Sequence, residues 1–148
     1  MEKKEKNIFV EGPISAAFIT DSIQKHSTKT SIGAHSIFLG QVRADDINGE
    51  TVTGIEYTTY EALALSTMHS LREQIFATYP LTCLHVYHSL GLVPTGEICL
   101  FVFASSPHRK VAIEACNETV EKIKELLPIW GREITTGGNQ YWKQNQTA

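Results

Sequence analysis

The sequence predicts one α+β domain with a mostly antiparallel sheet, two long helices and a C-terminal hairpin. The 148 residues suit a single domain over 1–148, with a possible small subdomain around 44–58. Apolar residues make up 42% of the chain and charged residues 20%, which is ordinary for a globular core. Two amphipathic helical patterns alternate with strand-like runs, and hairpin-length links between strands favour antiparallel pairing.

The first elements are a strand, a helix and two further strands. Pro13 is suited to the first turn of the first helix. Gly33 and Gly40 within the next strand mark bulges or close approaches of the backbone. Asn48-Gly49 in the loop 44–50 is the strongest hairpin signal, so we expect the following strand to pair back with the previous one. The expected bounds are 7–11 (strand), 13 to about 25 (helix), 31–42 (strand) and 51–58 (strand).

Two long helices carry most of the expected core. Apolar residues recur at spacings of three and four in each, and Pro80 and Pro128 end them. Three cysteines lie far apart in apolar runs, which favours buried thiols over disulfides or a zinc site. We expect Trp130 and Trp142, with Tyr141, to pack the terminal hairpin. The remaining bounds are 60–79 (helix), 81–90 and 97–104 (strands), 107–127 (helix), and 129–134 and 139–142 (strands), before a polar, frayed tail at 144–148.

Charge and hydropathy exclude several classes of function. The net charge of −3 argues against a nucleic-acid binder. Neither a signal peptide nor a membrane-spanning apolar run is visible, so a cytoplasmic protein is the expectation. Residues 44–106 hold one basic and seven acidic side chains. Residues 1–43 hold six basic and four acidic side chains, and residues 107–148 hold six basic and five acidic ones. An anion site should therefore draw on the two outer segments.

The start of the second long helix is a candidate anion cradle. His108, Arg109 and Lys110 follow a strand directly, where free backbone N–H groups and the helix dipole attract anions. Three cationic or ionisable side chains there oppose the dipole and cost helix stability, which is a sign of function. The alternative is an ordinary solvated helix start.

Two further cations are candidates, each with a simpler interpretation. Arg43 ends a strand just before Asp45 and Asp46, and it could pair with those aspartates at the rim. Lys124 lies on the last turn of the long helix, where any lysine complements the dipole, and nothing local distinguishes it from Lys122.

Metal chemistry is not expected. His35, His69, His85 and His88 show no metal-ligand spacing, and His85 and His88 should face opposite sides of a sheet. The sequence also lacks a P-loop, a GxGxxG fingerprint and a nucleophile elbow.

Four segments follow one another within residues 31–134: Gly33-Ala…Phe38-Leu-Gly40-Gln-Val-Arg43, then Ile55-Glu-Tyr57…Tyr60, then His88…Gly91…Gly96-Glu97 leading to Ser106-Pro-His108-Arg109, and finally Lys124…Pro128-Ile-Trp130…Arg132-Glu133. In this order and spacing the chain resembles the large, catalytic subunit of molybdopterin synthase. The resemblance implies an α/β hammerhead-type fold and a homodimer. It also implies that each end of the dimer binds a small ubiquitin-like sulfur-carrier subunit, giving a heterotetramer.

The implied reaction inserts two sulfurs into cyclic pyranopterin monophosphate and forms the dithiolene of molybdopterin. Sulfur arrives as a thiocarboxylate on the carrier's C-terminal glycine, and the chain itself binds no cofactor. By the resemblance, Lys124 is the catalytic lysine, acting as proton donor/acceptor or assisting carbonyl transfer. The other implied site residues bind substrate phosphate and pterin or line the pocket: Phe38, Arg43, His108, Arg109 and Arg132.

Two positions depart from the family pattern. Gly131 stands where a second catalytic lysine usually follows the tryptophan, and Ser89 stands where an arginine is usual. The lysine's role could pass to Arg132, Lys143 or Lys110, of which a lysine is the better chemical substitute because arginine is no base at neutral pH. The alternative is a non-catalytic paralogue that binds the carrier or the pterin without turnover.

Helix geometry adds an expectation about assembly. Arg109 and Lys124 are 15 residues apart on one expected helix, hence about 22 Å along its axis at roughly 1.5 Å per residue. We therefore expect His108 and Arg109 of one protomer to complete the pocket that holds Arg43 and Lys124 of the other.

Overall fold

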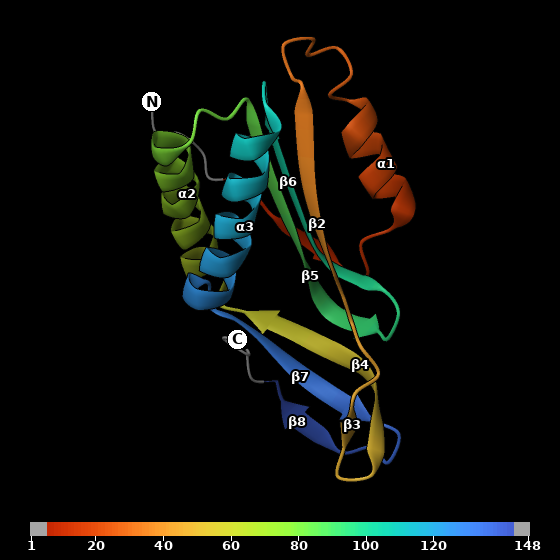
Figure 1. Cartoon of the computed structure of the whole chain (residues 1–148). Coiled ribbons are helices and arrows are strands. Elements are labelled where there is room, and N and C mark those ends of the chain that lie inside the picture. Colours follow the sequence, from red (N-terminus) through yellow and green to blue (C-terminus); the bar gives the residue numbers. More distant parts are fainter. Residues whose placement is uncertain (1–5, 144–148) are drawn as a thin grey trace.

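The computed structural model describes residues 6–143, which form three helices and eight strands (Figure 1). None of the helices described within this range is long and apolar enough to cross a membrane. The expected tail at 144–148 lies outside the described residues. The elements are β1 (Phe9–Glu11), α1 (Ala16–Gln24), β2 (Ala34–Gln41), β3 (Asp46–Ile47), β4 (Glu50–Thr59), α2 (Glu61–Thr78), β5 (Cys83–Pro94), β6 (Ile98–Ser106), α3 (Arg109–Leu126), β7 (Ile129–Thr135) and β8 (Gln140–Trp142).

The strands form one sheet in the order β2-β6-β5-β4-β7-β8, and every pair along this path is antiparallel. β1 adds to β5 in parallel, and β3 pairs with β4. Helices α2 and α3 cover one face of the upper half of the sheet, and α1 lies on the other face (Figure 1). The expected α+β class, with two long helices and a C-terminal hairpin, is confirmed.

Strand β6 is the centre of the core because it is buried on both faces. Leu100 and Val102 point to the side covered by α2 and α3, whereas Phe101 and Phe103 point to the side covered by α1. All four are fully buried. A strand enclosed on two sides needs a continuous apolar run rather than an alternating one, and this is the pattern found at 99–104.

Strand β5 joins the two halves of the sheet. Its first part, through His88, pairs with β6, and its last part, from Gly91 to Pro94, pairs with β4. Gly91 has φ +81°, a left-handed conformation that glycine adopts without strain, and it marks the change of partner. The segment expected to be a link after residue 90 is therefore partly strand.

The expected pairing of the Asn48-Gly49 hairpin is wrong in one respect. The turn does form, with positive φ at both residues, and it joins β4 to the two-residue strand β3. The longer partners of β4 are β5 and β7, however, and β2 pairs with β6 instead. Two backbone hydrogen bonds, from the Val42 N–H to the Glu97 carbonyl and from the Gly96 N–H to the Val42 carbonyl, hold the end of β2 beside the start of β6.

The first helix begins later than expected. Ser15 caps it by accepting a 3.1 Å hydrogen bond from the backbone N–H of Phe18, so Pro13 lies before the helix. The intervening Ile14 is held in an extended bridge to Ile98, with a 2.9 Å backbone bond. This bridge delays the start of α1.

Burial of the cysteines is confirmed, but the expected packing of the tryptophans is wrong. Cys83, Cys99 and Cys116 are free thiols in the interior. Trp130 is 51% exposed and Trp142 is 64% exposed. The start of α2 and the end of α3 lie above the β7–β8 hairpin (Figure 1), so no helix covers these indoles.

Gly33 allows β2 to approach the segment before α3, as its position in the strand indicated. A Cβ there would lie 2.1 Å from the carbonyl oxygen of Pro107. We therefore expect Gly33→Ala to lower the free energy of unfolding by about 1–3 kcal/mol, because backbone must move to relieve the overlap. Urea unfolding measures this, with the nearby exposed Ser31→Ala as the control. Equal midpoints for both variants would contradict the close approach.

Candidate functional site

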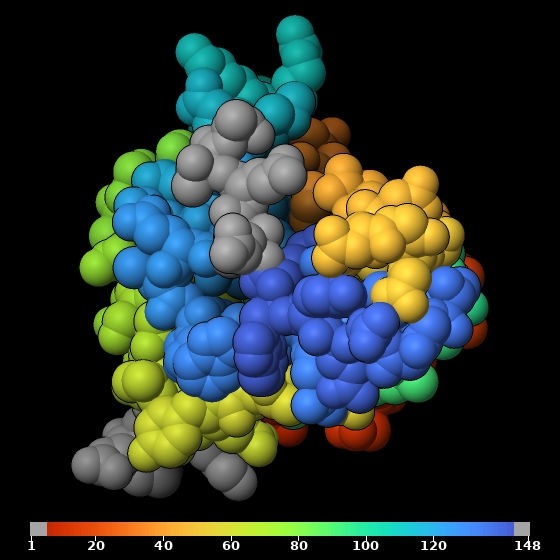
Figure 2. Space-filling model, turned by 90° about the horizontal axis from the view of Figure 1, so that it is seen from below, coloured from red at the N-terminus to blue at the C-terminus, as the bar shows by residue number. Residues whose placement is uncertain are grey.

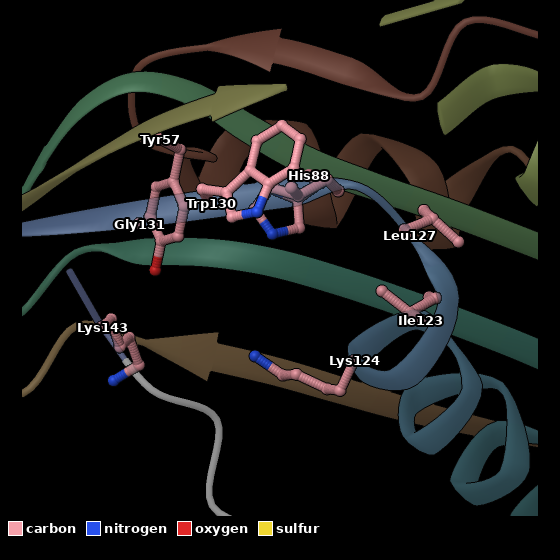
Figure 3. Close-up of a pocket in the computed structure, with 9 residues that line it drawn as sticks. Tyr57, His88, Ile123, Lys124, Leu127, Trp130, Gly131 and Lys143 are labelled. Atoms are coloured by element: carbon pink, nitrogen blue, oxygen red, sulfur yellow. The ribbon is translucent and has the colours of Figure 1, made fainter. Parts of the chain in front are cut away.

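A pocket of about 240 Å³ lies where the end of α3 meets strands β4, β5, β7 and the end of β8 (Figure 3). The first turn of α2 is close by, since the Tyr60 N–H contacts the carbonyl of Pro128, which follows α3. Seen from below, the β7–β8 hairpin (blue) lies beside the β3–β4 hairpin (yellow-orange), and the end of α3 adjoins them (Figure 2). The pocket is lined by Tyr57, His88, Ile123, Lys124, Leu127, Ile129, Trp130, Gly131 and Lys143.

Strand register brings the polar lining groups together. Tyr57 on β4 is the direct partner of both Gly91 on β5 and Gly131 on β7. The Tyr57 ring meets the His88 ring edge-on, with centroids 5.0 Å apart. Both side chains are buried, so the floor of the pocket is rigid.

Lys124 reaches into this pocket from the last turn of α3 (Figure 3). Its side chain is solvent-accessible, yet it lies in a concavity where protein atoms surround the ammonium. This desolvation lowers the pKa of Lys124 below its ordinary value. The charge of Lys143 lowers that pKa further, while Cys99 and Glu121 act in the opposite direction. A lysine in such a place is a better proton acceptor at neutral pH than an exposed one.

His88 and Tyr57 are held in their neutral forms. Burial lowers the pKa of His88 to about 4, and the nearby charge of Lys124 acts in the same direction. The His88 ring bonds through Nδ1 to the carbonyl of Ser89 at 2.8 Å. Burial also raises the pKa of the Tyr57 hydroxyl. The pocket therefore offers neutral hydrogen-bonding groups beside cationic amines.

Lys143 lines the pocket from the end of β8. Its backbone N–H donates to the carbonyl of Gly131 at 2.8 Å, so the two residues lie opposite each other across the terminal hairpin. Figure 3 shows Lys143 across the pocket from Lys124, with the Tyr57 hydroxyl directed toward the space between them.

The start of α3 forms a second, shallower pocket at the other end of the helix. His108, Arg109 and Lys110 line it together with Gly33, Ala34 and Pro107. These three cationic or ionisable residues gather as expected, and all are exposed. α3 is one continuous helix from Arg109 to Leu126, so within one chain this cluster and Lys124 stand at opposite ends.

The other expected site residues lie outside the pocket of Lys124. Arg43 is exposed and makes a 3.4 Å ion pair with Asp45, which matches the simpler interpretation of this residue. Phe38 lies on β2 and packs against the main core. Arg132 is paired with Glu56 on the neighbouring strand. The structure of one chain thus brings none of these three to Lys124.

One cluster escaped the sequence analysis. The ligand atoms of His26, Cys83 and His85 lie within 4.8 Å of one another. His26 comes from the end of α1, far away in sequence, so no spacing could reveal it. Hydrogen bonds already join these groups: His26 to His85 at 3.0 Å, Lys6 to His85 at 2.9 Å and Lys29 to Cys83 at 3.0 Å. A metal ion there would be placed beside two ammonium groups, which disfavours it.

The sequence analysis also assigned no role to Tyr57 or His88. Both stand in the segments that carry the family resemblance, at Ile55-Glu-Tyr57 and His88…Gly91. Their convergence depends on β4 and β5 being neighbours, and the local hairpin signal predicted a different partner for β4.

Comparison with known proteins gives a consistent result. The family model described as "MoaE protein" matches residues 11–126. Molybdopterin synthase catalytic subunit 1 of Aedes aegypti is 38% identical over 119 residues, covering 78% of this chain and 76% of that protein. The molybdopterin synthase catalytic subunit of Aspergillus fumigatus is 33% identical over 140 residues, covering 95% of this chain and 73% of that protein.

Solved structures agree. A molybdopterin synthase crystal structure from Staphylococcus aureus superposes with a TM-score of 0.82 at 27% identity, covering 97% of this chain and all of the other. The complex of subunits 1 and 2 of the molybdopterin-converting factor from Helicobacter pylori gives a TM-score of 0.78 at 22% identity, over 93% and 90% of the two chains, and shows a shared fold.

The low pKa of His88 predicts acid sensitivity. An unfolded histidine titrates near 6.5, whereas His88 in the fold takes up a proton only at about 4. The contribution of neutral His88 to stability is therefore present in full well above pH 6.5 and is lost, by up to about 1.4 kcal/mol per pH unit, as the pH drops toward 4. We expect His88→Gln to weaken this pH dependence in urea unfolding. His85, whose pKa is also lowered to about 4, and His35, whose pKa is lowered by burial, contribute to the pH dependence in the same direction. Identical pH dependence in the variant and the wild type would contradict a neutral, buried His88.

Proposed function

Because the chain belongs to the MoaE family of molybdopterin synthase catalytic subunits, we propose that it transfers sulfur from a thiocarboxylated carrier to cyclic pyranopterin monophosphate. The observation that supports this most directly is Lys124, whose side chain enters a concave pocket beside a second lysine. An anionic thiocarboxylate requires cations, and a lysine of lowered pKa is suited to proton transfer.

The proposed chemistry uses Lys124 for proton transfer. The thiocarboxylate sulfur attacks a substrate carbon that carries oxygen; the new carbon–sulfur bond replaces the carbon–oxygen bond, and the oxygen leaves with a proton donated by an ammonium group. The carrier is then joined to the substrate through a thioester. Water then cleaves the bond between the carrier's carbonyl carbon and sulfur, giving a carboxylate on the carrier and a thiol on the substrate. The neutral amine of Lys124 accepts the proton that the attacking water loses, and its ammonium returns a proton to the departing sulfur.

Exposed aromatic side chains near the pocket fit docking of the carrier. Trp130 lines the pocket, Trp142 lies on the neighbouring strand β8, and Tyr60 precedes α2; all three are exposed. Aromatic side chains of this kind are enriched in protein interfaces. The Helicobacter pylori relative of the same fold was solved as a complex of two subunits. We propose that a small ubiquitin-like carrier covers this surface and threads its C-terminus into the pocket.

The substrate phosphate is assigned to the start of α3. Arg109 and the helix N-terminus provide a charged fork and free N–H groups, which suit a phosphate. Arg43 and Phe38 are proposed to complete the substrate site, and Arg132 is proposed to add a cation near the pocket. Since α3 separates Arg109 from Lys124 within one chain, the two sites are proposed to meet across a homodimer interface. The assembly with two carriers would be a heterotetramer.

The second candidate function is a non-catalytic paralogue. Gly131 favours it, because the pocket lacks the lysine that the resemblance leads one to expect at this position. Such a protein would bind the carrier or the pterin without turnover. A cytoplasmic location, and the absence of a cofactor bound by the chain itself, remain expectations under either function.

Reconstitution tests the proposed activity. Purified protein, thiocarboxylated carrier and cyclic pyranopterin monophosphate should yield molybdopterin, detected by fluorescence of its oxidised derivative. We expect Lys124→Ala to lower kcat by at least about a hundredfold, because the proton-transfer group is lost. The control is Lys122→Ala. Lys122 lies two positions before Lys124 on the same helix, is half-exposed and pairs with Glu125. Lack of product with wild-type protein, together with carrier binding, would favour the non-catalytic alternative.

Mixed dimers test the proposed sharing of residues. Lys124→Ala and Arg109→Ala should each be inactive as homodimers. Co-refolding them in equal amounts should restore about a quarter of the wild-type rate, since half the dimers are mixed and each contains one intact site. Absence of any restored activity in dimers verified as mixed would show that both residues serve the same chain's site.

A further inference from the structure

The packing around Gly131 is tight, so a side chain at this position would require its neighbours to move. A Cβ there would lie 2.9 Å from Cγ2 of Ile55 and 3.1 Å from Cε1 of Tyr57. Tyr57 is buried and its ring meets His88 edge-on, so its displacement would disturb the floor of the pocket. An amine for this part of the pocket is therefore supplied more readily from another strand.

Lys143 stands directly across the hairpin from Gly131. The 2.8 Å bond from its backbone N–H to the Gly131 carbonyl extends the β7–β8 ladder by one step beyond the Arg132–Trp142 pair. Its side chain borders the same cavity as Lys124 (Figure 3). Strand pairing thus supplies a lysine to the space next to position 131.

The other two basic residues that could take over the role of the missing lysine, Lys110 and Arg132, are placed differently. Lys110 lines the pocket at the opposite end of α3. Arg132 is adjacent in sequence, but its guanidinium is engaged by Glu56 on β4. A guanidinium also stays protonated at neutral pH and offers no neutral amine.

The charges around the cavity are unbalanced in favour of anion binding. Among the described residues that line it, two are lysines and none is acidic. The titratable neighbours are Tyr57, His88 and Cys99, and the carboxylates of Glu121 and Glu133 act on the site from outside the lining. Two ammonium groups facing one cavity suit a small anion such as a carboxylate or thiocarboxylate.

We propose that Lys143 is the second substrate-facing amine of this pocket and binds the anionic C-terminal group of the carrier, in the place that Gly131 leaves without a side chain. The inference rests on the proposed function, since the anion is the carrier's thiocarboxylate before transfer and its carboxylate afterwards. Lys143 also holds a positive charge near Lys124, which favours the neutral amine of Lys124.

Three variants test this inference: Lys143→Met, Lys143→Arg and, as a control lysine that does not line the pocket, Lys122→Met. We expect Lys143→Met to raise the Kd for the carrier, and its KM, roughly ten- to hundredfold because a charge-assisted hydrogen bond is lost. Lys143→Arg should retain most of the binding, and Lys122→Met should match the wild type. Thermal unfolding confirms that each variant is folded.

The pH profile separates this role from a structural one. Without the charge of Lys143, the pKa of Lys124 should rise, so the low-pH limb of the kcat/KM profile should move to higher pH in Lys143→Met and stay in place in Lys143→Arg. A Lys143→Met protein with wild-type Kd and an unshifted profile would overturn the inference.

Binding keeps the two proposals distinguishable. If the wild-type protein gives no product, the proposed turnover fails, and calorimetric titration with carrier bearing a free C-terminal carboxylate still decides the role of Lys143. Weaker binding by Lys143→Met than by Lys122→Met supports it, and equal binding overturns it. Gly131→Lys gives a further check. We expect this variant to have lower activity and stability, because the new side chain would displace the Tyr57 ring. Activity several-fold above wild type would show that Lys143 does not serve as the second amine of the pocket.

Discussion

The packing of α3 across β2 and β6 is the constraint on which the functional architecture depends. β6 leads almost directly into α3, and the helix packs back onto the face of the sheet formed by β6 and its neighbour β2. The start of α3 is thereby fixed beside Gly33, where β2 comes close to Pro107. Its end is fixed above β4 and β7, where Pro128 turns the chain. One rigid element therefore holds a cationic cluster at one end and Lys124 at the other, and a small substrate can reach both only if a second chain contributes.

The pocket at the end of α3 shows how backbone pairing controls its chemistry. Tyr57 pairs with two glycines, Gly91 on β5 and Gly131 on β7, and the missing side chain of Gly131 leaves room for the Tyr57 ring, which meets His88 edge-on. A side chain at position 131 would need Ile55 and Tyr57 to move. The close packing of the Tyr57 ring and the lack of an amine at position 131 thus both follow from the glycine at this position.

Local patterns predicted the helices and most strands, and they failed where long-range pairing decides. The periodic apolar stripes of α2 and α3 fixed their ends to within two residues, because prolines terminate both. The Asn48-Gly49 turn formed, but a turn identifies only the strand next to it, so the partners β5 and β7 of β4 were missed. Trp130 and Trp142 were expected to pack because aromatic residues usually do, and their exposure depends on where α2 begins and α3 ends. His26, Cys83 and His85 meet only in three dimensions.

The terminal hairpin has a consequence for how relatives of this chain are compared. Lys143 follows Gly131 by 12 residues in sequence, yet an antiparallel ladder places the two beside each other. A functional amine could therefore pass from one strand to its neighbour during evolution and keep its location in space. Column-by-column alignment would record a missing lysine at one position and an unrelated lysine at another. For proteins built with such a hairpin, spatial equivalence is a better criterion for loss of a residue than positional identity.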